Sequence, residues 1–236
     1  MKKQVVILFG PPGAGKGTQG ELLSDKLSLY YFETSKILER EFAKAKDLSE
    51  DSKERFIEED GTKYDILEEN KLWEQGKLCD PPFVSHLVKK EIKELSERGE
   101  SLVLAGSPRT LYEGEKIIPV LEDLYGKDNV KALFIEISPK ETLFRNSHRR
   151  ICELMRHPIL YSKETKDLTI CPLDGSKLLK REGLDDPETI KVRLKEHKER
   201  TLPLIDFFKK QGIETKKING EQSVADVFKD ILSALE

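Results

Sequence analysis

Residues 10–20 read Gly10-Pro11-Pro12-Gly13-Ala14-Gly15-Lys16-Gly17-Thr18-Gln19-Gly20, and they directly follow the apolar run Val5-Val6-Ile7-Leu8-Phe9. This order predicts a buried strand that breaks into a glycine-rich loop and then a helix, the layout of a phosphate-binding loop. Glycines let successive backbone N–H groups point at an anion, and the N-terminus of the following helix adds partial positive charge. Lys16 is then placed to reach a phosphate, and Thr18 offers a hydroxyl near a magnesium ion.

The composition predicts neither a nucleic-acid nor a membrane partner. A net charge of -3 gives no basic field, and no apolar run approaches the length of a membrane span. The segment Met1-Lys2-Lys3-Gln4 leads straight into the first strand and lacks the apolar stretch of a signal peptide. The three cysteines form an odd, sparse set that favours a reducing compartment. We therefore expect a cytoplasmic protein.

Strand-like runs alternate with helical patterns along the chain. After residues 5–9, strands are expected at 101–105, 131–137 and 213–218, and helices at 19–28, 82–98, 114–124, 187–211 and 223–235. This alternation predicts an α/β fold in which helices cover both faces of a parallel sheet. Active sites of such folds lie beyond the carboxyl ends of the strands. The glycine loop and the turn Gly106-Ser107-Pro108-Arg109-Thr110 both follow strands in this way.

Two stretches interrupt the alternation, and each predicts a lobe inserted into a core formed by residues 1–33, 81–148 and 184–236. Residues 34–80 carry no clear strand and are rich in charge, and we interpret the run from Asp47 to Arg55 as a solvated helix face. Residues 149–183 hold Cys152 and Cys171 among several turn signals. The histidines suggest no catalytic triad, and His86 and His197 are expected to be exposed or to cap helices.

Arginines lie at turns and helix starts far from the glycine loop, at positions 109, 145, 149, 150, 181 and 193. Phosphoryl transfer needs such groups because negative charge spreads over several phosphate oxygens in the transition state. The planar guanidinium meets those oxygens in pairs. Arg109 is the strongest of these candidates because it follows a strand end.

The chain resembles the adenylate kinases over nearly its whole length. The loop at 10–19 is similar to the family's phosphate loop, and Gly106-Ser107-Pro108-Arg109-Thr110 resembles its Gly-Phe-Pro-Arg-Thr turn. The segments 145–150, 185–194 and 202–208 resemble those that enter the lid, leave it and follow it. The resemblance implies a P-loop NTPase fold of three α/β/α layers, in which 34–80 is an acceptor-nucleotide lobe and 149–183 a lid, both mobile.

The resemblance also implies roles for single residues. Catalysis would rest on Lys16, Arg109, Arg149 and Arg193. ATP would be held by Gly10, Pro12, Gly13, Ala14, Gly15, Lys16, Gly17, Thr18, Arg145 and Arg149. The acceptor nucleotide would meet Thr34, Arg40, Gly106, Arg109, Glu113, Arg181 and Arg193. Closure of the lobes would exclude water, which would otherwise hydrolyse ATP.

The acceptor side departs from the family pattern. Glu39 stands where an arginine belongs, so Arg40 or Lys36 is expected to substitute for it. Glu113 stands where a glutamine reads the base, and an ionised carboxylate accepts hydrogen bonds but donates none. AMP is the expected acceptor, with UMP, CMP or another nucleoside monophosphate as the alternative. A regulatory nucleotide-binding protein with weak transfer activity is a third interpretation.

The metal sites also depart from the pattern. Ala105 replaces an aspartate that helps to hold hydrated Mg²⁺, so we expect Mg²⁺ to bind mainly through the ATP phosphates, near Thr18. In the lid, Cys152, Cys171 and Asp174 match a zinc pattern, but Met155 stands where the second cysteine belongs, and His157 is the alternative ligand. Structural zinc needs four good ligands, so a lid without zinc is expected and bound zinc is the alternative. The family resemblance implies a monomer.

Overall fold

The computed structural model describes residues 3–50, 52–156, 158–180, 183 and 185–236. In these residues a five-stranded parallel sheet has the order β10-β6-β1-β5-β2. The strands are β1 (Val5–Phe9), β2 (Tyr30–Glu33), β5 (Leu102–Ala105), β6 (Val130–Glu136) and β10 (Thr215–Asn219). The first strand occupies the centre because all five of its residues are apolar and buried.

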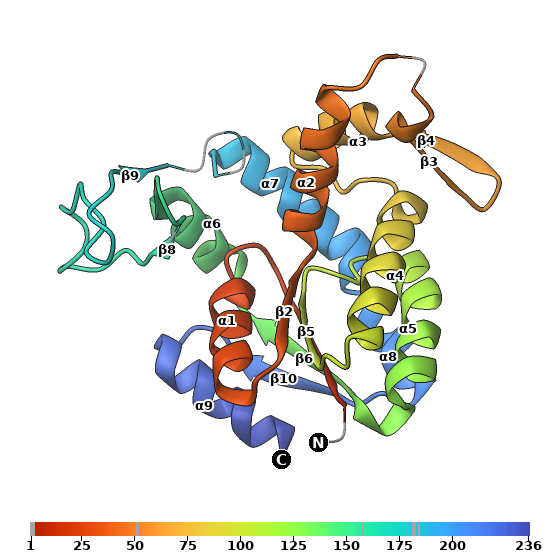
Figure 1. The fold of residues 1–236 in the computed structure, drawn as a ribbon. Helices are drawn as coiled ribbons and strands as arrows, with labels where there is room; N and C mark the ends of the chain where they lie inside the picture. The colour runs from red at the N-terminus through yellow and green to blue at the C-terminus, as the bar shows by residue number, and fades with distance from the viewer. Residues whose placement is uncertain (1–2, 51, 157, 181–182, 184) are drawn as a thin grey trace.

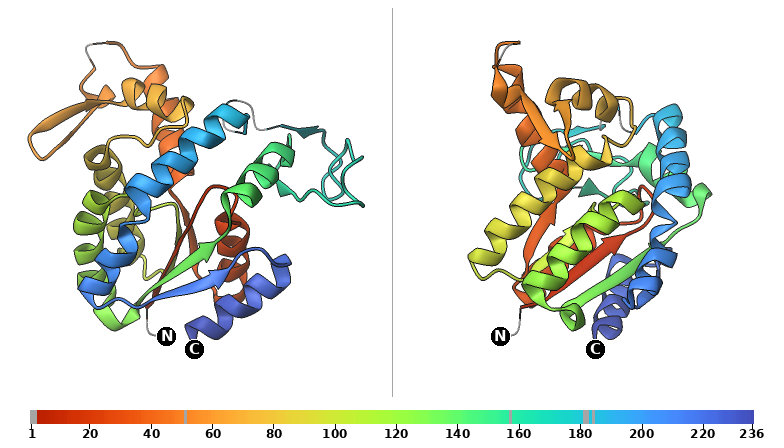
Figure 2. Two further views of the ribbon diagram at one scale, coloured as in Figure 1. Left: turned by 180° about the vertical axis from the view of Figure 1, so that it is seen from behind. Right: turned by 90° about the vertical axis from the view of Figure 1, so that its right-hand side faces the viewer.

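Helices cover both faces of this sheet (Figures 1 and 2). Alternate strand residues pack on one side against α4 (Pro81–Glu97), α5 (Leu111–Tyr125) and α8 (Leu204–Gln211). The other residues pack against α1 (Lys16–Leu27) and α9 (Val224–Leu235). The three-layer α/β/α arrangement with a parallel central sheet is therefore confirmed.

Two groups of elements project from this core at the carboxyl ends of the strands (Figure 1). Between β2 and α4 the chain forms α2 (Thr34–Lys46), a short 3₁₀ helix (Lys53–Arg55), the hairpin β3 (Phe56–Glu59) and β4 (Thr62–Asp65), and α3 (Ile66–Glu74). Between α6 (Pro139–His148) and α7 (Pro187–Glu196) it forms a small sheet of β7 (Arg150–Cys152), β8 (Pro158–Ile159) and β9 (Leu178–Leu179). Another short 3₁₀ helix (Lys127–Asn129) precedes β6.

The hairpin corrects the expectation that residues 34–80 carry no strand. Asp60 and Gly61 both have positive φ, at 52° and 75°, as a two-residue hairpin turn requires. An Asp-Gly pair between short strands was the sequence signal for this turn. Glu59 then ties the hairpin to α4 by accepting hydrogen bonds from His86 and Lys89.

Three further expectations differ from the structure. The described residues of the charged run 47–55 do not form a helix face, because α2 ends at Lys46 and Lys53–Arg55 form a 3₁₀ turn. The edge strand β2 was not expected, since it has only four residues. The helix expected over 187–211 is divided by a π-helical turn (His197–Thr201), after which Pro203, which has no N–H to donate, precedes α8.

Within the described residues, every helix is too short or too polar to cross a lipid bilayer.

Candidate active site

The glycine loop closes around the side chain of Lys16, the first residue of α1. Lys16 Nζ donates hydrogen bonds to the carbonyls of Gly10 at 2.8 Å and Pro11 at 2.9 Å. A Cβ atom on Gly10 would lie 2.3 Å from the Ile135 carbonyl oxygen of the neighbouring strand, so only glycine fits there. Burial, together with the charges of Arg109, Arg193 and Arg149, holds the pKa of Lys16 well below its ordinary value.

Those arginines reach the loop from separate parts of the chain. Arg109 follows β5, Arg149 caps the C-terminus of α6, and Arg193 lies on α7. All three line one large cleft together with Lys16. Since their charges act on the same ammonium group, the fold gathers positive charge where the loop presents its N–H groups.

Asp185 balances part of this charge. Arg149 donates to it from both Nε, at 2.8 Å, and Nη2. Arg193 Nη1 lies 3.7 Å from the same carboxylate. The Asp185 side chain is almost fully buried, at 4% exposure. A single carboxylate pairs with both Arg149 and Arg193, so it holds them in place beside the cleft while the cluster keeps a net positive charge.

Arg145 lies over the glycine loop from the side of α6. Its Nε donates to Glu141 at 2.6 Å, and its Nη2 donates to the carbonyl of Gly220 at 2.9 Å. Its Nη1 donates to the carbonyl of Gly13 at 3.4 Å. The guanidinium is thus held beside the loop.

The large cleft has a volume of about 620 Å³. The structure brings to it most of the residues predicted for ATP, catalysis and the acceptor phosphate: Gly10, Pro12, Gly13, Ala14, Gly15, Lys16, Gly17, Thr18, Gly106, Arg109, Arg145, Arg149 and Arg193. Their roles remain predictions, but their juxtaposition is a property of the fold.

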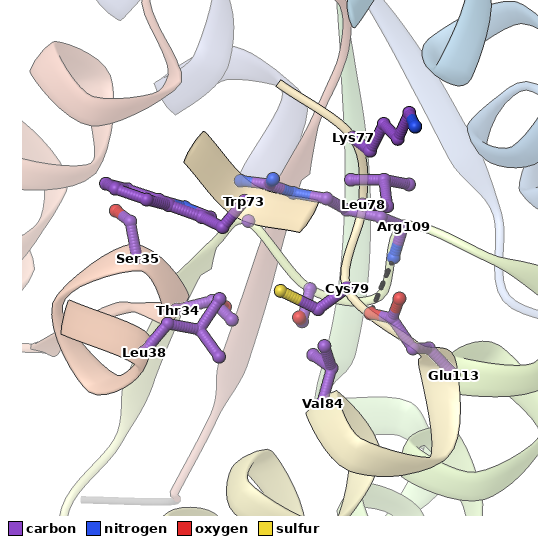
Figure 3. Close-up of a pocket in the computed structure, with 12 residues that line it drawn as sticks. Thr34, Ser35, Leu38, Trp73, Lys77, Leu78, Cys79, Val84, Arg109 and Glu113 are labelled. Atoms are coloured by element: carbon purple, nitrogen blue, oxygen red, sulfur yellow. Dashed lines mark hydrogen bonds between the residues drawn. The ribbon is translucent and has the colours of Figure 1, made fainter. Parts of the chain in front are cut away.

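A second, small pocket of about 30 Å³ opens beside Arg109 (Figure 3). Thr34 and Glu113, both predicted for the acceptor, line it. The Oγ1 atom of Thr34 is buried and has no hydrogen-bond partner in the described residues. A buried unpaired hydroxyl is costly, so this atom is a candidate for contact with a ligand.

Glu113 does not present a free carboxylate to the pocket. It accepts a hydrogen bond from the backbone N–H of Arg109 at 2.9 Å (Figure 3). It also accepts one from the Thr110 hydroxyl at 3.2 Å. Thr110 in turn caps α5 by accepting from the N–H of Glu113. The Thr-x-x-Glu spacing of a capping box is readable in the sequence, but here the Glu113 carboxylate accepts from the N–H of Arg109, one residue before the N-cap. Burial raises the pKa of Glu113, against the opposing effect of Arg109.

The structure does not bring Arg40 to the site. Among the described residues that line the two cavities, Glu39 and Lys36 are present and Arg40 is not. Arg40 instead donates to Glu91 at 2.8 Å and to Glu41 at 3.2 Å. One step along a helix turns a side chain by about 100°, which points Arg40 toward α4. Arg181 and His157 lie outside the described residues.

His197 is the C-cap residue of α7, in line with the capping position expected for it. Its place in the site was not expected: the ring stacks on Phe134 at 6.2 Å between centroids and lines the large cleft. Burial, aided by the charges of Lys16 and Arg109, lowers the pKa of His197 to about 4. The imidazole is therefore neutral at neutral pH. Trp73, Phe144 and Tyr161 also line the large cleft and were not singled out.

Cys152 of β7 and the loop residues Cys171 and Asp174 offer ligand atoms within 4.8 Å of one another. Met155, at the position of the second cysteine of the pattern, is 63% exposed. Cys152 donates a hydrogen bond to Asp174 at 3.0 Å, and Asp174 also accepts from Ser176. These hydrogen bonds hold the pKa of Asp174 well below its usual value. The described residues therefore provide three zinc-type ligands rather than four.

Comparison with known proteins identifies the family. The adenylate kinase family model matches residues 8–213. The adenylate kinase of Caldicellulosiruptor bescii is 34% identical over 98% of both chains. The adenylate kinase of Oceanobacillus iheyensis is 31% identical over 98% of both chains, and that of Staphylococcus aureus 29% over the same share. The chain belongs to the adenylate kinase family.

Proposed function

We propose that this protein transfers the terminal phosphoryl group of ATP to AMP and so forms two molecules of ADP. The observation that carries the proposal is the convergence of Lys16, Arg109, Arg149 and Arg193 on one cleft beside the glycine loop. A protein that only senses ATP needs no such cluster beyond the loop. Transfer between two phosphates concentrates more negative charge than either nucleotide alone, which explains the need for these cations.

On the donor side, the loop N–H groups and Lys16 hold the β- and γ-phosphates, and Arg145 lies over the base. Lys16 now bonds to carbonyls of its own loop, and a bound phosphate would replace those partners. On the acceptor side, Arg109 holds the AMP phosphate. An AMP oxygen attacks the γ-phosphorus while the bond to the β–γ bridging oxygen breaks, so no covalent enzyme intermediate and no protein base are needed.

Mg²⁺ accompanies ATP in this proposal and neutralises charge on the phosphates. Thr18 lines the cleft, and Ala105 leaves the end of β5 without a carboxylate. Glu33 is paired in register with Ala105 on the neighbouring strand and lines the same cleft. Glu33 stands two residues after Tyr31 in β2, so both side chains point to the same face of the sheet, and the ring of Tyr31 packs against Gly20 of α1. We assign Glu33 the task of holding magnesium-bound water.

The two projecting groups, residues 34–80 and 149–183, act in this proposal as the acceptor lobe and the lid, which close over the nucleotides. Closure brings Arg149 and Arg193 nearer to the transferring group and excludes water. The lid is held together by the Cys152–Asp174–Ser176 hydrogen bonds rather than by stoichiometric zinc. Metal analysis of purified protein tests this, because one zinc per chain would contradict it.

We further propose a cytoplasmic monomer. The cysteines at 79, 152 and 171 are buried and form no disulfide among the described residues, which fits a reducing compartment. Cell fractionation tests the compartment, and gel filtration combined with light scattering tests the mass in solution.

The decisive experiment measures ADP formed from ATP with AMP, against ATP alone, with CMP, UMP and GMP as alternative acceptors. We expect rapid ADP formation with AMP and only slow hydrolysis without an acceptor. A preference for another monophosphate would replace AMP in the proposal. No transfer to any acceptor would overturn it and favour a regulatory nucleotide-binding protein.

A further inference from the structure

The small pocket is the least explained cavity of the site. On its deep side lie Thr34, Leu38, Cys79, Val84, Ser107 and Glu113, which line it without reaching the large cleft. Its mouth is formed by residues that line both cavities, among them Trp73, Lys77, Leu78 and Arg109. An interior that combines the apolar side chains of Leu38 and Val84 with the Thr34 hydroxyl, next to an arginine, suits a flat ring carrying a phosphate.

Two observations indicate that the pocket receives a ligand. The Thr34 hydroxyl is buried without a partner in the described residues, and it lies beside Gly106. A Cβ on Gly106 would stand 3.3 Å from Thr34 Oγ1 and 3.1 Å from Arg109 Nη2. The φ of Gly106 is +128°, a conformation that residues with a side chain rarely adopt. Glycine thus keeps open the space between the hydroxyl and the guanidinium.

Trp73 is the large aromatic side chain at the mouth. It lies in the last turn of α3, and its ring packs against Phe42 of α2 at 6.0 Å between centroids. Figure 3 shows its indole and the side chain of Val84 at opposite sides of the pocket. The indole is half-buried, so one part rests on the lobe and another part faces the cavity.

We infer that Trp73 is a specificity-determining residue, whose indole stacks on the base of the acceptor nucleotide while Arg109 holds its phosphate. This inference rests on the proposed transfer to a nucleoside monophosphate. A pocket of about 30 Å³ has room for about one water, so the base enters only when the mouth widens. Trp73 stands on α3, outside the core sheet, and moves with the acceptor lobe when the mouth opens. The base then lies between the indole and the apolar wall at Val84.

Stacking on Trp73 also favours purine nucleotides over pyrimidine nucleotides as acceptors. Stacking on an aromatic side chain contributes about 1–3 kcal/mol per base, and it scales with the overlapping ring area. A purine overlaps the indole more fully than a pyrimidine does. Trp73 therefore favours AMP over CMP and UMP independently of hydrogen bonds to the base edge.

Trp73 is the single tryptophan of the chain, so its fluorescence reports on the pocket directly. Titration of the full-length protein with AMP should quench this fluorescence and saturate. Ribose 5-phosphate, which lacks a base, should leave it nearly unchanged at concentrations that occupy Arg109. Equal responses to both ligands would place the base elsewhere and overturn the inference.

Steady-state kinetics with Trp73→Leu and Trp73→Phe provide the second test. The leucine variant should raise the KM for AMP by about tenfold and lower the preference for AMP over CMP, with kcat and the KM for ATP within about twofold. The phenylalanine variant, which retains a ring, should recover most of the loss. The matched control is Tyr64→Leu, because Tyr64 is an aromatic packed on the same core among the described residues that line neither cavity.

The outcomes separate the two proposals. An unchanged KM for AMP in Trp73→Leu, with normal thermal stability and wild-type transfer intact, overturns the inference and leaves the proposed function standing. An equal rise in Tyr64→Leu also overturns it, because the effect would then come from packing of the lobe. If the wild-type protein makes no ADP from ATP and AMP, the proposed function fails, whatever the fluorescence shows.

Discussion

The glycine loop and the small pocket are built in different ways. The loop comes from one contiguous stretch between β1 and α1, and it borders a cleft of about 620 Å³ in this structure. The pocket is assembled from α2, α3, the start of α4 and the turn after β5, and it measures about 30 Å³. In the proposed function, the donor side is thus a local and largely preformed loop, whereas the acceptor side depends on how a lobe packs against the core. Preorganisation is expected where charge is stabilised, and mobility where substrate enters.

Removal of Lys16 should have the largest effect, because the donor side is preformed around it. Lys16→Met keeps much of the side-chain volume and loses the ammonium group that meets the phosphates. We expect kcat to fall about 10³-fold, in line with the loss of one preorganised electrostatic contact. Initial rates of ADP formation measure this, and circular dichroism checks the fold. A rate within tenfold of wild type would remove Lys16 from the catalytic set.

Arg109 and Arg40 were both predicted to contact the acceptor, and comparing their alanine variants tests which of them does. Arg109→Ala should lower kcat/KM for AMP about 10²- to 10³-fold, because its guanidinium lies between the two cavities. Arg40→Ala should change kcat/KM less than about threefold, because Arg40 pairs with Glu91 and Glu41 at the surface. Parallel assays of both variants decide the point. Similar losses in the two would show that α2 shifts to bring Arg40 into the closed site.

His197, which lines the large cleft, should make the free energy of unfolding depend on pH. Its pKa is about 4 in the folded protein against an ordinary value of 6.5, so the unfolded chain binds more protons between these values. The free energy of unfolding should therefore rise from pH 4 to pH 6.5, with His197 contributing about 2 kcal/mol after allowance for its partial exposure.

Urea unfolding at several pH values measures this contribution. His197→Phe keeps a ring against Phe134 and removes the titrating group, so its unfolding free energy should vary less with pH. Since all carboxylates titrate in both proteins, the difference between the two curves isolates His197. Parallel curves would mean that the imidazole is not held neutral by its surroundings.

The smallest expected effect concerns Glu33. Glu33→Gln should weaken binding of the reporter ion Mn²⁺ to the ATP complex about fivefold, as read by electron paramagnetic resonance, and raise the Mg²⁺ concentration for half-maximal rate. Lys36→Gln is the control, because it removes the 3.3 Å ion pair with Glu33 but keeps the carboxylate. Ala105→Asp in the Glu33→Gln background should restore the affinity. Unchanged Mn²⁺ binding in Glu33→Gln would leave the metal to the phosphates and Thr18.

For the fold, the accurate predictions were those that followed from contiguous sequence. Strand β1, the glycine loop, and helices α4 and α9 depend on neighbouring residues, because periodicity and glycine content act locally. The predictions were wrong for elements whose local sequence pattern is weak and whose stability comes from contacts with distant parts of the chain. The hairpin at 56–65 gains its stability from α4, and β2 is a four-residue edge strand that gains its ladder from β5.

For the site, the sequence by itself determined which chemistry is possible. Gly10 to Thr18 and the arginines define a place for phosphates, since the residue types alone set charge and hydrogen-bonding capacity. Only the tertiary structure decided which of these groups meet. It turned Arg40 toward Glu91, committed Glu113 to the cap of α5, set Glu33 beside Ala105, and placed Trp73 at the mouth of the pocket. The physical reason is that a side chain's direction depends on how its helix or strand packs against elements far away in the sequence.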